Sequence, residues 1–159
     1  MRDSKIKLLF FFIFILTLSC GFKPVDKSIL LNYNIRSLEI KNSNKVNYLI
    51  KNKIENIFSN KKAKSRLNIK ILSSLNKNIK EKNIKNQITK YEIILSGSVE
   101  LNYLDINEKR SFSVSQKGNY NVASSHADTI KNQNNLETLL AEKAAEEIIN
   151  KIILISNDL

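Results

Sequence analysis

Cys20 is the residue of this 159-residue chain whose type and position indicate a definite chemistry. It is the single cysteine, and it ends an apolar run that spans 11 residues from Leu8 to Leu18. Basic residues precede the run, which is typical of a signal peptide, and a spanning helix would need about 20 residues. A thiolate at the cleavage site can take a diacylglyceryl group, and two or more acyl chains anchor a protein stably. The sequence therefore predicts a lipoprotein signal peptide over residues 1–19 and lipidation at Cys20.

Two other interpretations of this start stay open. The segment could be a cleaved secretory signal in which the cysteine has no role, or an uncleaved anchor helix. Thr17 stands three residues before Cys20, where a bacterial lipobox prefers leucine, so the efficiency of cleavage is a separate question. A single cysteine also excludes an internal disulfide, and the fold must be held by its core.

The remaining reactive side chains do not predict a catalytic or metal-binding set. His126 is the only histidine, so with Cys20 lipidated neither a zinc cluster nor a thiol–imidazole pair can form. Ser124 and Ser125 directly precede His126 in the chain, and adjacent residues rarely point toward each other as a catalytic triad requires. Asp128 is not part of any motif that would complete a triad. We interpret this stretch as a polar loop and expect no enzyme activity, no metal and no cofactor.

Basic residues exceed acidic ones by 26 to 15, and the excess is concentrated between Asn60 and Lys90. That segment contains a single acid, Glu81. Its bases are Lys61, Lys62, Lys64, Arg66, Lys70, Lys77, Lys80, Lys82, Lys85 and Lys90. All but Lys70 and Lys90 are candidate anion-binding residues. Such a segment could meet lipid phosphate or nucleic acid. A nucleotide-composition bias would enrich lysine and asparagine with no binding site, and both interpretations stay open.

Hydrophobic periodicity predicts the elements that position these residues. The two-residue period of strands and the three-and-four spacing of helices place strands at 35–40, 66–71, 91–103 and 112–122, and helices at 44–59 and 134–155. Residues 20–34 are expected to form a tether, 76–86 an exposed connection and 105–109 a turn. The order βαβββα predicts one α+β domain over 35–159, a two-layer sandwich with two helices packed on one face of a four-stranded mixed sheet. The other sheet face would then be polar.

Short motifs at both ends of the mature chain resemble one protein family. Residues 20–24 (CGFKP) are similar to the CGF-x-P start of LptE-type lipopolysaccharide-assembly lipoproteins, especially the divergent alphaproteobacterial ones. Residues 110–114 (RSFSV), 120–123 (YNVA) and 139–141 (LLA), with an alanine-rich terminal helix, resemble the last strand and helix of that family. The resemblance covers the mature chain, and the predicted order of elements fits it.

The resemblance implies a non-catalytic subunit of the lipopolysaccharide translocon, anchored in the cell outer membrane by the Cys20 lipid. Its partner would be an LptD-type β-barrel, which it would plug and help to assemble while lipopolysaccharide is delivered to the outer leaflet. Lipopolysaccharide phosphates could then accept charge-assisted hydrogen bonds from the basic segment, and no nucleic-acid partner is implied. The alternatives are a generic envelope lipoprotein that scaffolds another complex and a module for anionic lipid surfaces.

Overall fold

The computed structural model describes residues 32–41, 44–58, 63 and 65–159. Its elements follow the order strand, helix, three strands, helix. They are β1 (Tyr33–Lys41), α2 (Lys45–Ile57), β2 (Ser65–Lys82), β3 (Ile88–Tyr103), β4 (Glu108–Asn121) and α3 (His126–Asn157). The predicted α+β class and the βαβββα order are confirmed.

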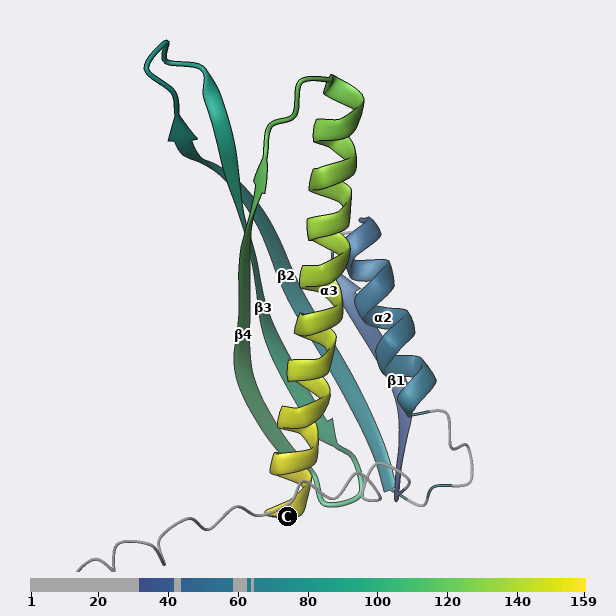
Figure 1. Ribbon diagram of the computed structural model, residues 1–159. Coiled ribbons are helices and arrows are strands. Elements are labelled where there is room, and N and C mark those ends of the chain that lie inside the picture. The colour runs from purple at the N-terminus through teal and green to yellow at the C-terminus, as the bar shows by residue number, and fades with distance from the viewer. Residues whose placement is uncertain (1–31, 42–43, 59–62, 64) are drawn as a thin grey trace, which may run out of the picture.

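The four strands form one mixed sheet in the order β1-β2-β3-β4. β1 and β2 are parallel because α2 returns the chain to the same end of the sheet between them. β2, β3 and β4 are connected by short turns and are antiparallel. Both helices lie on one face of the sheet (Figure 1), so the predicted two-layer arrangement is confirmed as well.

The core lies between this sheet face and the helices. Alternate residues of the strands are buried in it, such as Leu67, Ile69 and Ile71 of β2, because successive side chains of a strand point to opposite faces. α3 contributes a stripe at three- and four-residue spacing, consisting of Leu140, Ala141, Ala144, Ala145, Ile148, Ile149, Ile152 and Ile153. The one-sided burial of the sheet follows from the alternation in the sequence.

Two polar side chains buried in the core are hydrogen-bonded. Asn47 of α2 accepts a bond from Ser73 Oγ at 2.6 Å and donates one to the Lys41 carbonyl oxygen at 3.2 Å, which ties the helix to β2 and β1. Ser156 lies 3.0 Å from the Tyr103 hydroxyl, and burial raises the pKa of Tyr103. These groups therefore avoid the cost of an unsatisfied buried polar atom.

Residues 76–86 are exposed as predicted, but the prediction that all of them form a connection is wrong. β2 runs to Lys82, and only a tight turn separates it from β3. The amide oxygen of Asn83 accepts bonds from the backbone N–H groups of Lys85 and Gln87, and Asn86 has a φ of 60°. This hairpin extends past the helices (Figure 1), so neither face buries apolar side chains and the alternation that reveals a strand is missing.

Ser124 and Ser125 lie in a short loop after β4 as predicted, but the last helix begins at His126, earlier than the predicted residue 134, so the loop prediction is wrong from His126 onward. Ser125 is the N-cap, and its hydroxyl accepts a bond from the Asp128 backbone N–H at 3.0 Å. The negative charge of Asp128 in the first turn also interacts favourably with the positive end of the helix dipole. The Ser-x-x-Asp spacing was the available signal. The apolar stripe begins further along because the first turns of α3 lie beyond the core.

Gly118 marks the closest approach of α3 to β4. A Cβ atom on Gly118 would lie 2.6 Å from Leu136 Cδ1, closer than carbon atoms can approach. We expect Gly118→Val to lower the free energy of unfolding by about 1–3 kcal/mol, because the added carbons must push Leu136 aside. Denaturant unfolding measures this loss. Asn119→Val is the matched control on the exposed face of the same strand, and an equal loss in both variants would contradict the packing explanation.

Candidate functional site

The sheet face turned away from the helices is not covered by any described element. Its side chains are mostly short and polar: Ser37, Glu39, Asn68, Lys70, Ser74, Ser96, Ser98, Glu100, Asn102, Ser111, Ser113 and Ser115. Leu72 and Ile94 are the apolar exceptions on β2 and β3. The predicted polar face is therefore present, and we call it the outer face.

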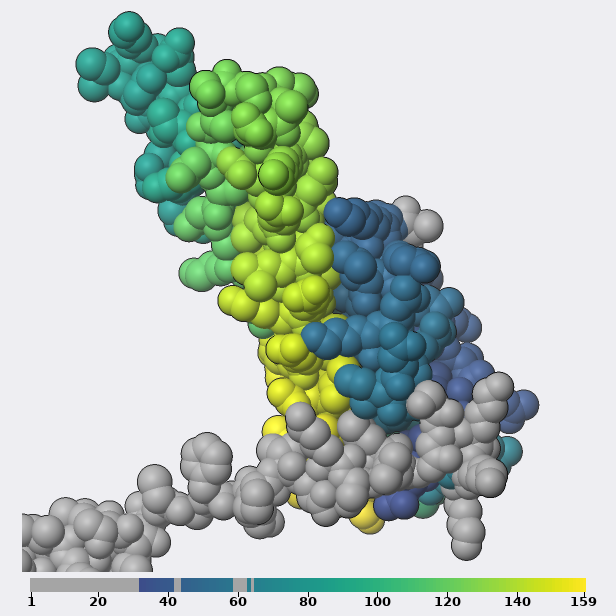
Figure 2. Space-filling model, turned by 45° about the vertical axis from the view of Figure 1, so that its right-hand side comes forward, coloured from purple at the N-terminus to yellow at the C-terminus, as the bar shows by residue number. Residues whose placement is uncertain are grey.

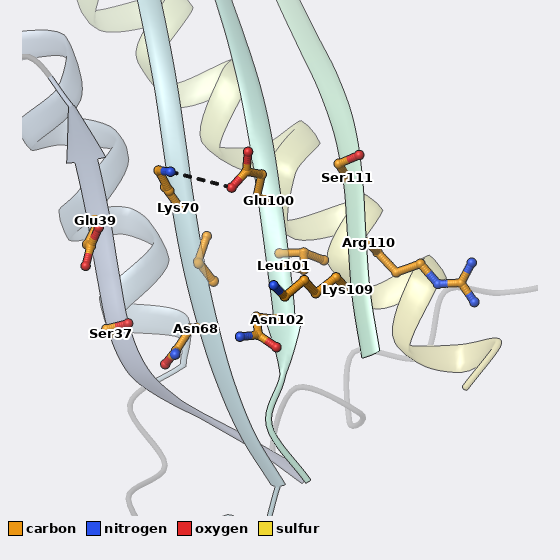
Figure 3. Close-up of a pocket in the computed structure, with 11 residues that line it drawn as sticks. Ser37, Glu39, Asn68, Lys70, Glu100, Leu101, Asn102, Lys109, Arg110 and Ser111 are labelled. Carbon is orange, nitrogen blue, oxygen red and sulfur yellow. Dashed lines mark ion pairs between the residues drawn. The ribbon is translucent and has the colours of Figure 1, made fainter. Parts of the chain in front are cut away.

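A hollow of about 520 Å³ lies on the outer face and draws side chains from all four strands (Figure 3). Lys70 Nζ lies 3.7 Å from Glu100 Oε2 across it. The Asn68 Oδ1 atom is buried and has no hydrogen-bond partner among the described residues. Arg110 points away past the edge of β4 and pairs with Glu108. The hollow offers mixed charges and amides to a polar group.

The basic segment does not form one site. Lys61, Lys62 and Lys64 lie outside the described residues. Arg66, at the start of β2, pairs with Asp105 at 2.9 Å. The Arg66 backbone N–H and guanidinium both donate to Asp105, and these bonds lower the pKa of that carboxyl. The Arg66 charge is thus already neutralised by a side chain of the β3–β4 turn.

The other predicted lysines lie toward the opposite end of β2 and in the turn after it, roughly 35–50 Å from Arg66 at the usual rise per strand residue. Lys80 Nζ lies 2.9 Å from Glu92, whose pKa it lowers. Lys82 Nζ donates to the neutral amide oxygen of Asn86 at 3.0 Å. Lys85 lies in the turn with no ion pair to any described residue. Lys82 and Lys85 therefore carry the uncompensated charge at the tip of the projecting hairpin (Figure 2).

Lys77 connects the hairpin to α3. Its Nζ lies 4.2 Å from the centre of the Tyr91 ring and donates to Gln133 Oε1 at 2.9 Å. The Tyr120 hydroxyl donates to the same oxygen at 3.0 Å. The predicted anion-binding Lys77 is thus engaged by aromatic rings and an amide. No local sequence pattern predicts this contact, because Gln133 lies 56 residues after Lys77 in the chain.

Cys20 lies outside the described residues, and the structure does not test its lipidation. Within residues 32–41, 44–58, 63 and 65–159, no three histidine, cysteine or acidic side chains lie close enough together to hold a metal ion. Among the same residues, no helix has the length and apolar content to cross a membrane.

Three solved bacterial structures resemble this one. Uncharacterized lipoprotein B from Nitrosomonas europaea matches with a TM-score of 0.61 and 11% identity, over 86% of this chain and 93% of that one. A protein of Caulobacter crescentus classed as a lipoprotein has a TM-score of 0.56 and 14% identity, over 82% and 95%. Rare lipoprotein B from Shewanella oneidensis has a TM-score of 0.51 and 14% identity, over 79% of this chain and 94% of that one.

The chain shares the fold of these lipoproteins. At 11–14% identity the likeness is one of fold, and none of the three names states a function. No family model matches the chain, and no curated protein matches its sequence. The fold likeness agrees with the lipoprotein signal inferred around Cys20, which depends on different residues.

Proposed function

We propose that this chain is a lipid-anchored subunit of the outer membrane that lodges in or beside an LptD-type β-barrel and assists lipopolysaccharide delivery to the outer leaflet. Its role is to bind and position, without catalysis. The Cys20 lipid holds it to the inner leaflet, and the sandwich domain meets the barrel.

The polar outer face carries this proposal. Serine and asparagine side chains of all four strands cover it, and no described helix packs on it. The lumen of an outer-membrane barrel is polar, so a polar sheet face can lie against its wall without placing apolar groups in water. The fold shared with bacterial lipoproteins agrees with the lipid-anchored part of the proposal.

Site-specific photo-crosslinking tests the proposal. A photoreactive residue at Ser98, which is exposed at the centre of the outer face, should yield an adduct with a large β-barrel when the full chain is produced in its host. Glu142, exposed on α3, is the matched control and should yield less of that adduct. Adducts from Glu142 alone would contradict the assignment of the outer face, and absence of a barrel from both positions would contradict the function.

Lipopolysaccharide phosphates are the proposed ligand of Lys82 and Lys85. Each lysine near an anionic surface contributes about 1 kcal/mol, so the double change to glutamine should weaken binding about 30-fold at low ionic strength. The difference should shrink in salt, because exposed charges are screened. Binding of the purified full chain to lipopolysaccharide, measured at two salt concentrations, checks the prediction.

A matched control separates this site from net charge. Lys70 and Lys90 are paired with Glu100 and Glu81, so changing both to glutamine alters net charge equally but removes no uncompensated charge. Equal losses in the two double variants would contradict a site at the hairpin tip. Equal binding to phosphatidylglycerol vesicles without lipopolysaccharide would favour the alternative role on anionic lipid surfaces.

A further inference from the structure

β1 covers only part of the β2 edge. The pairing of the two strands ends at Lys41 and Leu72, whereas β2 continues to Lys82. Figure 1 shows β1 and α2 ending well short of the hairpin tip. Beyond Leu72, no described strand lies on that side of β2. The sheet therefore has a vacant strand position directly in line with β1.

The backbone groups of the vacant edge can be identified from the register. The Leu104 N–H donates to the Arg66 carbonyl oxygen, so even-numbered residues of β2 exchange their backbone bonds with β3. The register is regular from Leu67 to Ile79, so the odd-numbered residues present their N–H and C=O groups to the other side. Leu75, Lys77 and Ile79 thus face the vacant position with backbone groups that no described residue satisfies.

The edge is only partly protected against strand addition. Natural edges are kept short, bulged, charged or covered. Lys77 lies on this edge and the register with β3 is irregular beyond Ile79, but the register from Leu75 to Ile79 is regular. On the free edge of β4, by contrast, side chains bond to the backbone: Lys151 Nζ donates to the Ser113 carbonyl oxygen and Asn132 Nδ2 to that of Asn121. The Leu75–Ile79 edge has no capping side chain among the described residues, and Ile79 is 52% exposed.

The charges around the vacant position are positive. Lys41 ends β1 and Lys45 begins α2. Lys77 belongs to the edge strand, and its side chain is turned toward Tyr91 and Gln133, neither of which is an acid that would neutralise its charge. α2 has no acidic residue in its first turn, so the positive end of its dipole is uncompensated by an acid there. Glu39, the only acid of β1, points to the outer face. An acidic segment would complement this surface.

We propose that the β2 edge from Leu75 to Ile79 binds an extended acidic segment of a partner protein, which adds a strand to the sheet in line with β1. Backbone hydrogen bonds supply the affinity, and the lysines select acidic side chains. The site requires only the extended acidic segment, so it does not depend on whether the barrel is the partner.

The probe is a capped eight-residue peptide of alternating valine and glutamate, added to the purified full chain. Amide hydrogen exchange should slow at Leu75, Lys77 and Ile79. A peptide with N-methyl groups on two of the residues that face β2 should bind about 30-fold more weakly, since each lost bond is worth about 1 kcal/mol. Exchanging glutamate for lysine should weaken binding by a similar factor.

A pair of variants tests the same edge from the protein side. Lys77→Pro removes a backbone donor that β3 does not use, whereas Lys77→Gln removes the same charge and keeps the donor. Binding should be about fivefold weaker in the proline variant than in the glutamine variant, because one bond is lost. If the proline variant does not fold, binding of the methylated peptide to the unchanged protein tests the same backbone bonds. Equal binding of the methylated peptide, or no protection of the three amides at millimolar peptide, would overturn the proposal.

Discussion

Replacing Ile152 by alanine is expected to lower the free energy of unfolding by about 3 kcal/mol, within the range for buried isoleucine truncations. Ile152 lies in the stripe of α3 that faces the core and is fully buried, with 0% of its surface exposed. Three methyl or methylene carbons would be lost, and the sheet and α2 leave little room for the site to collapse. The loss is a large fraction of the 5–15 kcal/mol that is typical for a folded domain.

Equilibrium denaturation of the purified chain measures this loss, and a shifted midpoint at constant slope shows that stability has changed. Asn150→Ala is the matched control, because Asn150 is exposed two residues earlier on α3. Its effect should stay within about 0.5 kcal/mol. An Ile152→Ala loss below about 1 kcal/mol would mean that this part of α3 does not pack against the sheet as described.

The fold was predictable wherever one face of an element is buried. Leu67, Ile69 and Ile71 alternate because the helices cover one side of β2, and the stripe ending at Ile153 repeats because α3 lies on the sheet. The same strand was missed from Leu72 onward. There the hairpin projects beyond the helices and the backbone pairing with β3, rather than apolar burial, holds it extended.

The site was less predictable because its charges are decided by distant partners. Arg66 and Lys82 look alike in the basic segment, but Arg66 is paired with Asp105, 39 residues away. Lys82 meets only the neutral amide of Asn86. No local pattern distinguishes them, since the pairing depends on which turns the sheet brings together. Among the candidate bases that the structure describes, Lys82 and Lys85 at the hairpin tip therefore remain as the anion-binding candidates.

The largest expected effect on the protein in its host comes from Cys20→Ser. The serine hydroxyl cannot replace the thiolate that takes the diacylglyceryl group, so acylation should be lost and the signal peptide should remain uncleaved by the lipoprotein peptidase. Without the acyl chains the protein loses the anchor that would hold it to the outer membrane. Metabolic labelling with a radioactive fatty acid, followed by membrane fractionation and mass analysis of the chain, measures all three consequences.

Two variants beside Cys20 separate loss of the thiol from damage to the signal. Ser19→Ala keeps a small residue before the cysteine and should retain full labelling. Thr17→Leu restores the leucine that a lipobox prefers and should speed cleavage if the site is a lipobox. Fatty-acid labelling that persists in Cys20→Ser would refute lipidation at this residue. Normal cleavage of that variant would instead indicate an ordinary secretory signal, because general signal cleavage requires small residues but no thiol.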